Sequence, residues 1–362
     1  MLGPSLQTGS SAKPPVLALL GLYALGLAWG VFLQTGPRVG DEAWTWLFSR
    51  DLARGLLDVH PALPYLLLHP FSRFGEAGPQ ATGWAVAALV ALAPPLAALA
   101  YGNLAGLAVL FSSGFALSAG FARPHSLVLP EVFLLLYALK TGRDKLAAFA
   151  GTLLVLTHFQ GQVALLAALP LFTPRGRKVL LDWLANNPLV WLEGMRAFAL
   201  ALAVVSGEGA GSPLLDPGGF ARGALGGGVA AAGLALLAAR GSLRAPGVGL
   251  IGAGVALALF LVKRVAPPYG GLVGALAALL AALGLPREGK ARSLLALALV
   301  LVALPGGIGT GLEVREAREK VRVLAEAEGP LEVRTDTSAP LALRLAGYEG
   351  RFYCAPSRLP VR

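Results

Sequence analysis

The chain has 362 residues with a formal net charge of +10, and 56% of the residues are hydrophobic while only 14% are charged. A soluble domain needs more charged side chains to cover its surface, so this composition excludes an ordinary soluble protein and predicts a polytopic membrane protein. The single cysteine excludes a disulfide framework and a multi-cysteine metal cage, and the basic excess is typical of loops that orient membrane spans rather than of a nucleic-acid partner.

Eleven apolar segments, each about 20 residues long or somewhat shorter, predict an all-α fold with about 11 transmembrane helices. The first, Pro15–Leu33, follows Lys13 and has no small-residue cleavage site, so we expect it to be a membrane helix and not a signal peptide. The others are Gln80–Ala100, Leu104–Phe121, Ser126–Lys140, Leu146–His158, Phe159–Phe172, Leu189–Val205, Ala224–Ala239, Gly247–Val262, Gly270–Leu285 and Ser293–Ile308.

The stretch Leu146–Phe172 decides the orientation, because it is long for one span and short for two. If the chain turns near His158, four basic clusters lie on the side of Lys13, as the positive-inside rule favours. These clusters are Lys140/Arg143/Lys145, Arg175/Arg177/Lys178, Arg240/Arg244 and Arg287/Lys290/Arg292. The amino terminus is then cytoplasmic and the carboxyl terminus is outside. Four segments face outward together in this topology, namely Gly40–Tyr65, Arg123–His125, Gly207–Arg222 and Lys263-Arg264.

The outer loop 34–79 contains the segment 40–65, which is dense in ionisable residues. Its apolar residues recur at steps of three and four, which predicts an amphipathic helix that Asp41 caps and that lies in the membrane interface. A break at Asp58-Val59-His60-Pro61 follows. The apolar side comprises Trp44, Leu47, Phe48, Leu52 and Leu56, and the other side Glu42, Thr45, Ser49, Arg50 and Arg54.

Asp41 and Glu42 are the candidate catalytic residues. Adjacent side chains on a helix point about 100° apart, so we expect one carboxylate to face a cavity and the other to face solvent or a cation. The inward carboxylate, near a like charge and a low-dielectric surface, should have a raised pKa that suits a general base. The alternative is that the pair serves only as a helix cap and as a polar interfacial group.

The C-terminal segment 312–362 changes in character from apolar to charged. VREAREKVRVLAEAEG predicts an amphipathic helix, LEVRT a strand, APLALRLAG a short helix and GRFYCA another strand. We therefore expect two domains: a transmembrane domain, 1–311, and a small α/β extracytoplasmic module, 312–362.

Three segments resemble the GT-C glycosyltransferases, most closely the bacterial relatives of protein O-mannosyltransferases and of the lipid A aminoarabinose transferase, a glycosyltransferase family 39-like group. GDEAWTWLFSRDLARGLLDVHPALPYLLL is similar to their first outer loop, although Ala62 stands where a second proline is usual. ARPHSLVLPEVFLLLYALK resembles their Arg-Pro-Tyr-Ser-Leu segment, with His125 in place of tyrosine, and LVLTHFQGQVALLAALP resembles their Leu-Thr-His-Tyr stretch. The resemblance covers roughly residues 15–175 and leaves the remainder as a generic hydrophobic half.

The resemblance implies a multi-pass protein of the bacterial inner membrane that transfers a sugar, with inversion, from a polyprenyl-phosphate donor at the extracytoplasmic face. The acceptor is a lipid, a glycan or a protein, and membrane lipids surround the chain. The family's catalytic acidic residue corresponds to Asp41, whereas the second aspartate of some branches has no counterpart near Arg123. Outer carboxylates are sparse, so we expect neither a metal nor a cofactor.

Candidate substrate-binding residues are the cations and histidines expected on the outer side. Arg123 could hold a lipid phosphate in a bidentate contact, or it could be an interfacial arginine that contacts bulk headgroups. His158 could orient a substrate or be a hydrogen-bonded core histidine, and His60 could simply shape the break. The remaining candidates are His125, Asp58, Arg50, Arg54 and Lys263.

Two other classes of function stay open. A transporter or flippase of a lipid-linked or small polar substrate would place ionisable residues near the bilayer midplane and show paired repeats, whereas the charges here gather at one face. A non-catalytic protein would use the C-terminal segment to bind an outer partner. The absence of a Walker motif favours a lipid-linked donor over a nucleotide sugar.

Overall fold

A computed structural model of the chain describes residues 14–56, 58, 60–193, 195, 229–261, 267–286, 290–333 and 339–354. Its first half contains the helices α1 Val16–Gln34, α2 Glu42–Arg50, α3 Leu52–Gly55, α4 Leu63–Ser72, η1 Gly75–Ala77, α5 Gly78–Val90, α6 Ala93–Tyr101, α7 Asn103–Leu110, α8 Ser113–Gly120, η2 Pro124–Leu127, α9 Val128–Lys140 and α10 Asp144–Thr157. The second half contains α11 Phe159–Ala168, η3 Leu169–Leu171, α12 Pro174–Ala185, α15 Val229–Arg244, α16 Pro246–Leu261, η4 Pro267–Gly270, α17 Gly271–Gly284, α18 Lys290–Ala325, β1 Leu331–Val333, α19 Ala339–Leu345 and β2 Phe352–Cys354.

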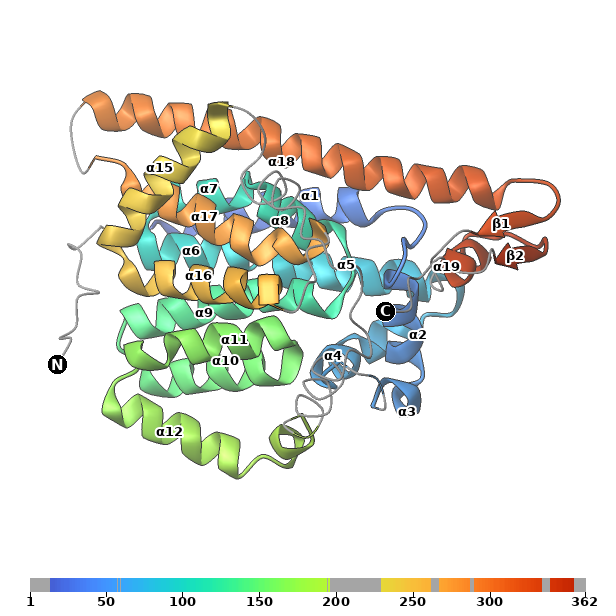
Figure 1. Cartoon of the computed structure of the whole chain (residues 1–362), viewed down its shortest axis with the longest axis horizontal. Coiled ribbons are helices and arrows are strands. Elements are labelled where there is room, and N and C mark those ends of the chain that lie inside the picture. The colour runs from blue at the N-terminus through green and yellow to red at the C-terminus, as the bar shows by residue number, and fades with distance from the viewer. Residues whose placement is uncertain are drawn as a thin grey trace.

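The long helices run side by side in one bundle (Figure 1). Its core is a continuous apolar cluster that includes fully buried Phe115 and Phe133, while α1 keeps large apolar side chains such as Leu17 and Leu20 exposed. Among the described residues, three helices, 16–34, 75–101 and 292–325, are long and apolar enough to cross a membrane, and α7 with α8 makes a fourth if the bent pair is one span. Apolar side chains that face outward from such helices are those a bilayer covers, so the bundle is an all-α membrane protein.

Two expectations about the spans meet different outcomes. Leu104–Phe121 is not one straight span, because α7 and α8 meet at a 60° bend where the Ser112 hydroxyl accepts the backbone N–H of Phe115 and starts a new helix. The turn near His158 is confirmed, since α10 ends at Thr157, α11 begins at Phe159 and His158 itself is extended. The number of membrane crossings stays a prediction.

The amphipathic segment after α1 forms two helices instead of one, because the backbone of Asp51 leaves the helical conformation between α2 and α3. Glu42, Thr45 and Ser49 are buried against the protein. Trp44, Leu47 and Phe48, on the opposite side, are only half-buried. The apolar face of α2 is thus directed away from the bundle, which suits a helix in the membrane interface.

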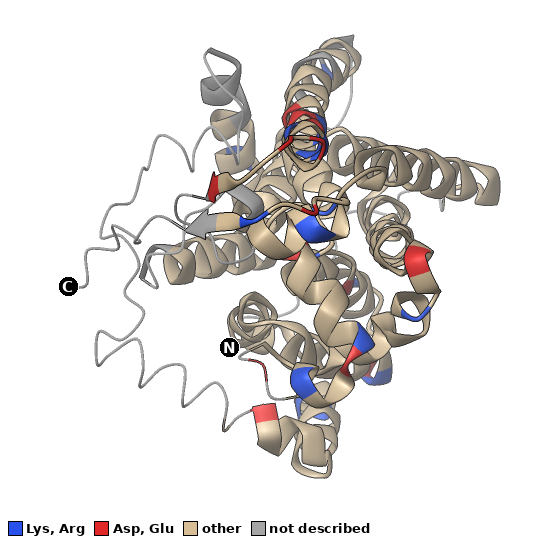
Figure 2. Cartoon of the chain, turned by 90° about the vertical axis from the view of Figure 1, so that its right-hand side faces the viewer, with Lys and Arg blue, Asp and Glu red and all other residues tan. Residues whose placement is uncertain are grey.

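One end of the bundle carries α2–α4 together with the elements that follow α18 (Figure 1). There β1 and β2 pair in parallel, with Leu331 opposite Phe352, and α19 packs against both α18 and α2. The helix α18 continues unbroken past residue 312, so the predicted domain boundary falls inside it. Figure 2 looks onto this end and shows Lys and Arg residues in blue and Asp and Glu residues in red, distributed over several helices. The predicted loop Gly207–Arg222 and most of the predicted span Leu189–Val205 lie outside the described residues.

Candidate active site

Glu42 begins α2 and Asp41 directly precedes it, and the two side chains have different partners, as expected for neighbours at a helix start. Asp41 does not cap α2 with its side chain, which corrects the capping expectation. Its Oδ2 instead lies 3.3 Å from Nη1 of Arg123, with the Asp41 side chain 57% exposed and that of Arg123 14% exposed. The structure therefore brings together an accessible carboxylate and a mostly buried guanidinium from residues that lie far apart in the sequence.

Glu42 is fully buried and its two oxygens accept four hydrogen bonds or ion-pair contacts. Arg318 of α18 donates to both oxygens, at 2.8 and 2.9 Å, while the backbone N–H groups of Ala122 and Val39 each donate at 2.7 Å. A buried carboxylate with this many donors is held in a fixed orientation. Glu42 thus joins α2 to α18 and to the end of α8.

This arrangement reverses the expected titration of the inward carboxylate. Burial alone raises the pKa of Glu42, but Arg318, Arg38 and the hydrogen bond from Ala122 outweigh burial and lower the pKa to about 2. The reason is that nearby cations, which the sequence did not place there, favour the charged form. Arg38 is itself buried, and burial together with Arg318 lowers its pKa to about 9.

Three histidines that the sequence nominated come together near the Asp41–Arg123 pair. The ring centroids of His60 and His158 are 5.6 Å apart in a stacked arrangement, and those of His125 and His158 are 5.7 Å apart. Tyr269 of η4 lies 4.8 Å from His125, centroid to centroid. Because His125 follows Arg123 by two residues, this aromatic cluster adjoins the Asp41–Arg123 pair.

The break after α3 is held by hydrogen bonds around Asp58. Its Oδ2 lies 2.8 Å from Nδ1 of His60. The same oxygen accepts hydrogen bonds from the backbone N–H of His60, at 3.3 Å, and from the hydroxyl of Tyr65. The backbone N–H of Ala62 donates to buried Glu193 at 3.0 Å. These contacts fix the His60 ring against His158, so Asp58 acts on the cluster through His60.

The remaining predicted cations lie elsewhere. Arg54 is exposed and forms an ion pair of 3.1 Å with Asp51 of its own segment. Arg50 stacks over Trp46 and, with His69, Arg73 and Gly75, lines a separate polar pocket of about 420 Å³. Lys263 lies outside the described residues.

Sequence reasoning missed three groups. Arg38 and Arg318 are fully buried cations, and Glu131 at the start of α9 is buried with its Oε1 accepting the Thr157 hydroxyl at 2.6 Å. Arg318 had a detectable signal, since it lies four residues after Val314 and three before Val321, within the apolar stripe of its helix. Glu131 also had a signal, because it is an ionisable residue inside the predicted span Ser126–Lys140. Arg38 had none, because its burial depends on segments distant in sequence.

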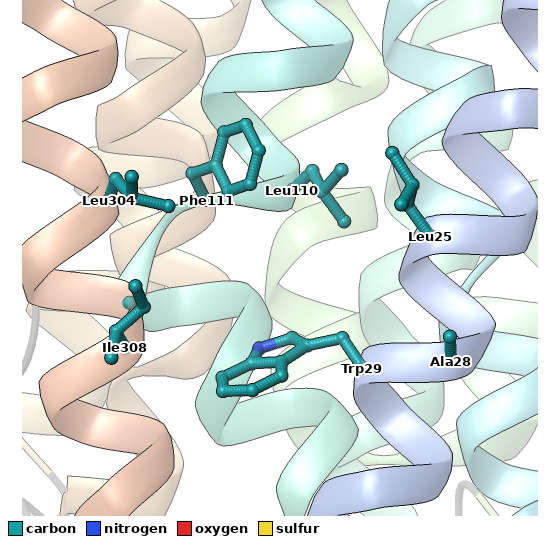
Figure 3. A pocket seen from close by; sticks show the side chains of 8 residues that line it. Leu25, Ala28, Trp29, Leu110, Phe111, Leu304 and Ile308 are labelled. Atoms are coloured by element: carbon teal, nitrogen blue, oxygen red, sulfur yellow. The ribbon is translucent and has the colours of Figure 1, made fainter.

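An apolar cavity of about 430 Å³ opens deeper in the bundle (Figure 3). It lies between α1, the α7–α8 bend and α18, and Trp29 of α1 projects across it. Trp29 precedes the last residue of α1 by five positions, which is about 8 Å along a helix axis. Its lining is Leu25, Ala28, Trp29, Leu110, Phe111, Leu304, Gly307 and Ile308.

Comparison with known proteins gives one informative match. No family model and no curated protein matches the sequence. The structure is similar to that of ArnT from Cupriavidus metallidurans bound to undecaprenyl phosphate, with a TM-score of 0.58 and 16% sequence identity. The similarity covers 91% of this chain and 84% of that chain. At this identity the likeness shows the fold, and the chain shares the fold of that ArnT structure, in line with the resemblance of its sequence motifs.

Proposed function

We propose that this protein is an inverting glycosyltransferase that moves a sugar from a polyprenyl-phosphate donor to an acceptor at the extracytoplasmic membrane face. The observation that carries the proposal is the fold shared with ArnT, whose structure holds undecaprenyl phosphate. The Asp41–Arg123 pair at one end of the bundle supports it further, because it joins an accessible base to a cation suited to phosphate.

In the proposed reaction Asp41 takes the proton of an acceptor hydroxyl while that oxygen attacks the anomeric carbon of the donor sugar. The new carbon–oxygen bond forms as the bond between the sugar and the phosphate oxygen breaks, and the polyprenyl phosphate leaves with the bonding electrons. Attack from the side opposite the phosphate inverts the anomeric centre. Asp41 has the exposure that this role requires, whereas Glu42 is enclosed by its partners.

Arg123 stabilises the charge that develops on the departing phosphate. A guanidinium has five N–H donors, and the ion pair with Asp41 at 3.3 Å involves Nη1, so other donors stay available for a phosphate oxygen within the described part of the chain. The buried cations Arg38 and Arg318 outnumber Glu42 nearby, so the local electrostatic balance also favours an anionic ligand.

The cluster of His60, His125, His158 and Tyr269 lies at the same end of the bundle, with His125 and His158 buried and with His60 and Tyr269 partly exposed. In the proposal the partly exposed rings of His60 and Tyr269 border the sugar, since aromatic faces pack on the apolar side of a pyranose. The apolar cavity between α1, the α7–α8 bend and α18 accommodates part of the donor's polyprenyl chain.

The test compares the lipids and glycans of membranes with and without the protein by mass spectrometry, with a set of polyprenyl-phosphate sugars supplied as donors. We expect one donor to be consumed and one acceptor to gain a sugar only when the protein is present. Purified protein in liposomes then provides a second arm. Movement of the intact donor across the bilayer without release of polyprenyl phosphate would replace the proposal with a flippase.

A further inference from the structure

The helix α18 approaches the outer end of α1 and α8 through small residues. A Cβ built on Gly311 would meet the Trp29 ring at 2.5 Å, so that glycine permits close contact with α1. On the neighbouring turn Val314 packs against Leu117 and Phe121, beside Gly120. This packing sets the depth and rotation of α18 at the level of the α1–α2 connection.

One turn further along α18, the side chain of Arg318 enters the protein and is only 1% exposed. Its Nε donates to the carbonyl of Leu33 at 2.7 Å, and Nη2 donates to the carbonyl of Gly120 at 2.7 Å. Further donors reach the carbonyl of Pro37, the Gln34 side chain and both oxygens of Glu42. Arg318 therefore ties together the ends of α1 and α8 and the start of α2.

The residue held by Arg318 is the immediate neighbour of Asp41. Fixing Glu42 at two oxygens fixes the first turn of α2, and with it the direction in which the Asp41 side chain leaves the backbone. A second contact restrains the same helix, because α19 packs against α2. The partner of Asp41 is restrained too, since Gly120 and Ala122, which precede Arg123 in the chain, bond to Arg318 and Glu42.

We propose that Arg318 is a positioning residue that holds the Asp41–Arg123 pair in its reactive geometry through Glu42, so that the segment after residue 312 completes the active site. This inference rests on the proposed glycosyl transfer. It changes how the C-terminal segment is understood, because loss of activity on its deletion would not then indicate a separate binding module. Arg318 touches no substrate, being enclosed by carbonyls and Glu42.

The chain provides a matched control one turn earlier on the same helix. Arg315 also contacts the end of α1, through the carbonyls of Thr35 and Phe32 and over the Phe32 ring, but it does not reach Glu42. A change at Arg315 therefore perturbs the α18–α1 contact without releasing the carboxylate beside Asp41.

The experiment measures donor turnover by the full-length protein in liposomes for Arg318→Lys and Arg315→Met. Lysine keeps the charge but cannot form the paired contacts to Glu42. We expect Arg318→Lys to lower kcat by about tenfold to a hundredfold, with the KM for the donor within about twofold, because a small displacement of a reacting group affects the chemical step first. Arg315→Met should keep both constants within about twofold of wild type. An unchanged kcat in Arg318→Lys, or equal losses in both variants, would overturn the inference.

A second measurement is independent of activity. Spin labels at Ala53→Cys and Val323→Cys, in a Cys354→Ser background that removes the native thiol, report the distance between α3 and α18. We expect a narrow distance distribution with Arg318 present and a broad one in Arg318→Met. An unaltered distribution would contradict the inference that Arg318 holds the start of α2. If the wild-type protein transfers no sugar but the distribution still broadens in Arg318→Met, only the proposed function is contradicted.

Discussion

Two adjacent carboxylates of this protein lie in opposite surroundings. Glu42 is enclosed at the junction of α1, α2, α8 and α18, where four donors fill its oxygens and its pKa is lowered to about 2. Asp41 is 57% exposed and contacts one guanidinium, that of Arg123. The difference separates two tasks that the sequence could not divide: Glu42 is suited to hold the loop, and Asp41 is suited to meet a substrate.

The largest expected effect tests the Asp41 side of the comparison. Asp41→Asn removes the proposed base while keeping the shape of the side chain, so we expect transfer to fall by about a thousandfold. Stability should stay within about 0.5 kcal/mol of wild type, because the side chain is mostly exposed. The measurement is release of polyprenyl phosphate, together with thermal unfolding in the same detergent. Wild-type turnover in this variant would remove Asp41 from the mechanism.

A change at Arg123 tests its pairing with Asp41. Arg123→Lys keeps a positive charge but loses the fork that can contact a carboxylate and a phosphate together. We expect kcat to fall by about a hundredfold, because one stabilising donor of a developing charge contributes that much in other enzymes. Steady-state kinetics with varied donor provide the test. If Arg123 only anchors the interface, the variant will transfer sugar at the wild-type rate.

Glu42→Gln tests how much the buried carboxylate of Glu42 contributes to folding stability. The lowered pKa of Glu42 corresponds to about 3 kcal/mol of folding free energy, which the neutral amide would lose. Unfolding measured at pH 7 should show a loss of that order. A loss below about 0.5 kcal/mol would mean that the ion pair with Arg318 contributes nothing net.

The same residue predicts a pH dependence. A carboxyl whose folded pKa is depressed stabilises the protein above its unfolded pKa, and that contribution disappears as pH falls through the folded value. For Glu42 the window runs from about 4.5 down to about 2. The stability difference between wild type and Glu42→Gln should therefore be constant from pH 7 to pH 5 and shrink below pH 4.5. A difference that persists at pH 2 would contradict the assignment.

A smaller effect is expected at the histidine cluster. His158→Ala removes the ring that lies between His60 and His125, and we expect about a tenfold loss of turnover, as for loss of an orienting hydrogen bond. His69→Ala is a matched control, because that ring bonds the carbonyl of Ser49 in another part of the loop. Equal losses in the two variants would argue for a general structural effect.

The smallest effect concerns Arg54, which the sequence proposed as a phosphate contact. Its side chain is 66% exposed and paired with Asp51, so Arg54→Ala should alter neither turnover nor donor KM by more than about twofold. A large rise in donor KM would show that α3 contacts the substrate and would enlarge the site beyond the Asp41–Arg123 pair.

The helical bundle could be predicted because apolar length and Gly or Pro breaks are local properties. The turn at His158 followed from the distribution of basic loops, and the amphipathic character of α2 followed from its periodicity. The bend at Ser112 was not predicted, since hydropathy is continuous through it and the break comes from a side-chain cap. Hydropathy and periodicity therefore predict the helical bundle but not the bends within its helices.

The candidate site was predictable as a set of residues but not as a geometry. Arg123 lies beside Asp41 and the rings of His60, His125 and His158 gather, whereas Arg50 and Arg54 lie apart. The partition between Asp41 and Glu42 could not be read from the sequence, because it depends on Arg318, 276 positions away from Glu42 in the chain. A charged helix is ordinarily taken to be solvated, and only the place of Arg318 in an apolar stripe marks it as different.

The most direct test measures sugar transfer per folded molecule for the two adjacent carboxylates in one assay, with Asp41→Asn beside Glu42→Gln. The folded fraction of each sample is taken from its unfolding curve. Exposed Asp41 and enclosed Glu42 predict that Asp41→Asn has at least about a tenfold lower rate per folded molecule than Glu42→Gln. A higher rate for Asp41→Asn than for Glu42→Gln would assign the proton transfer to Glu42 and contradict the division of roles.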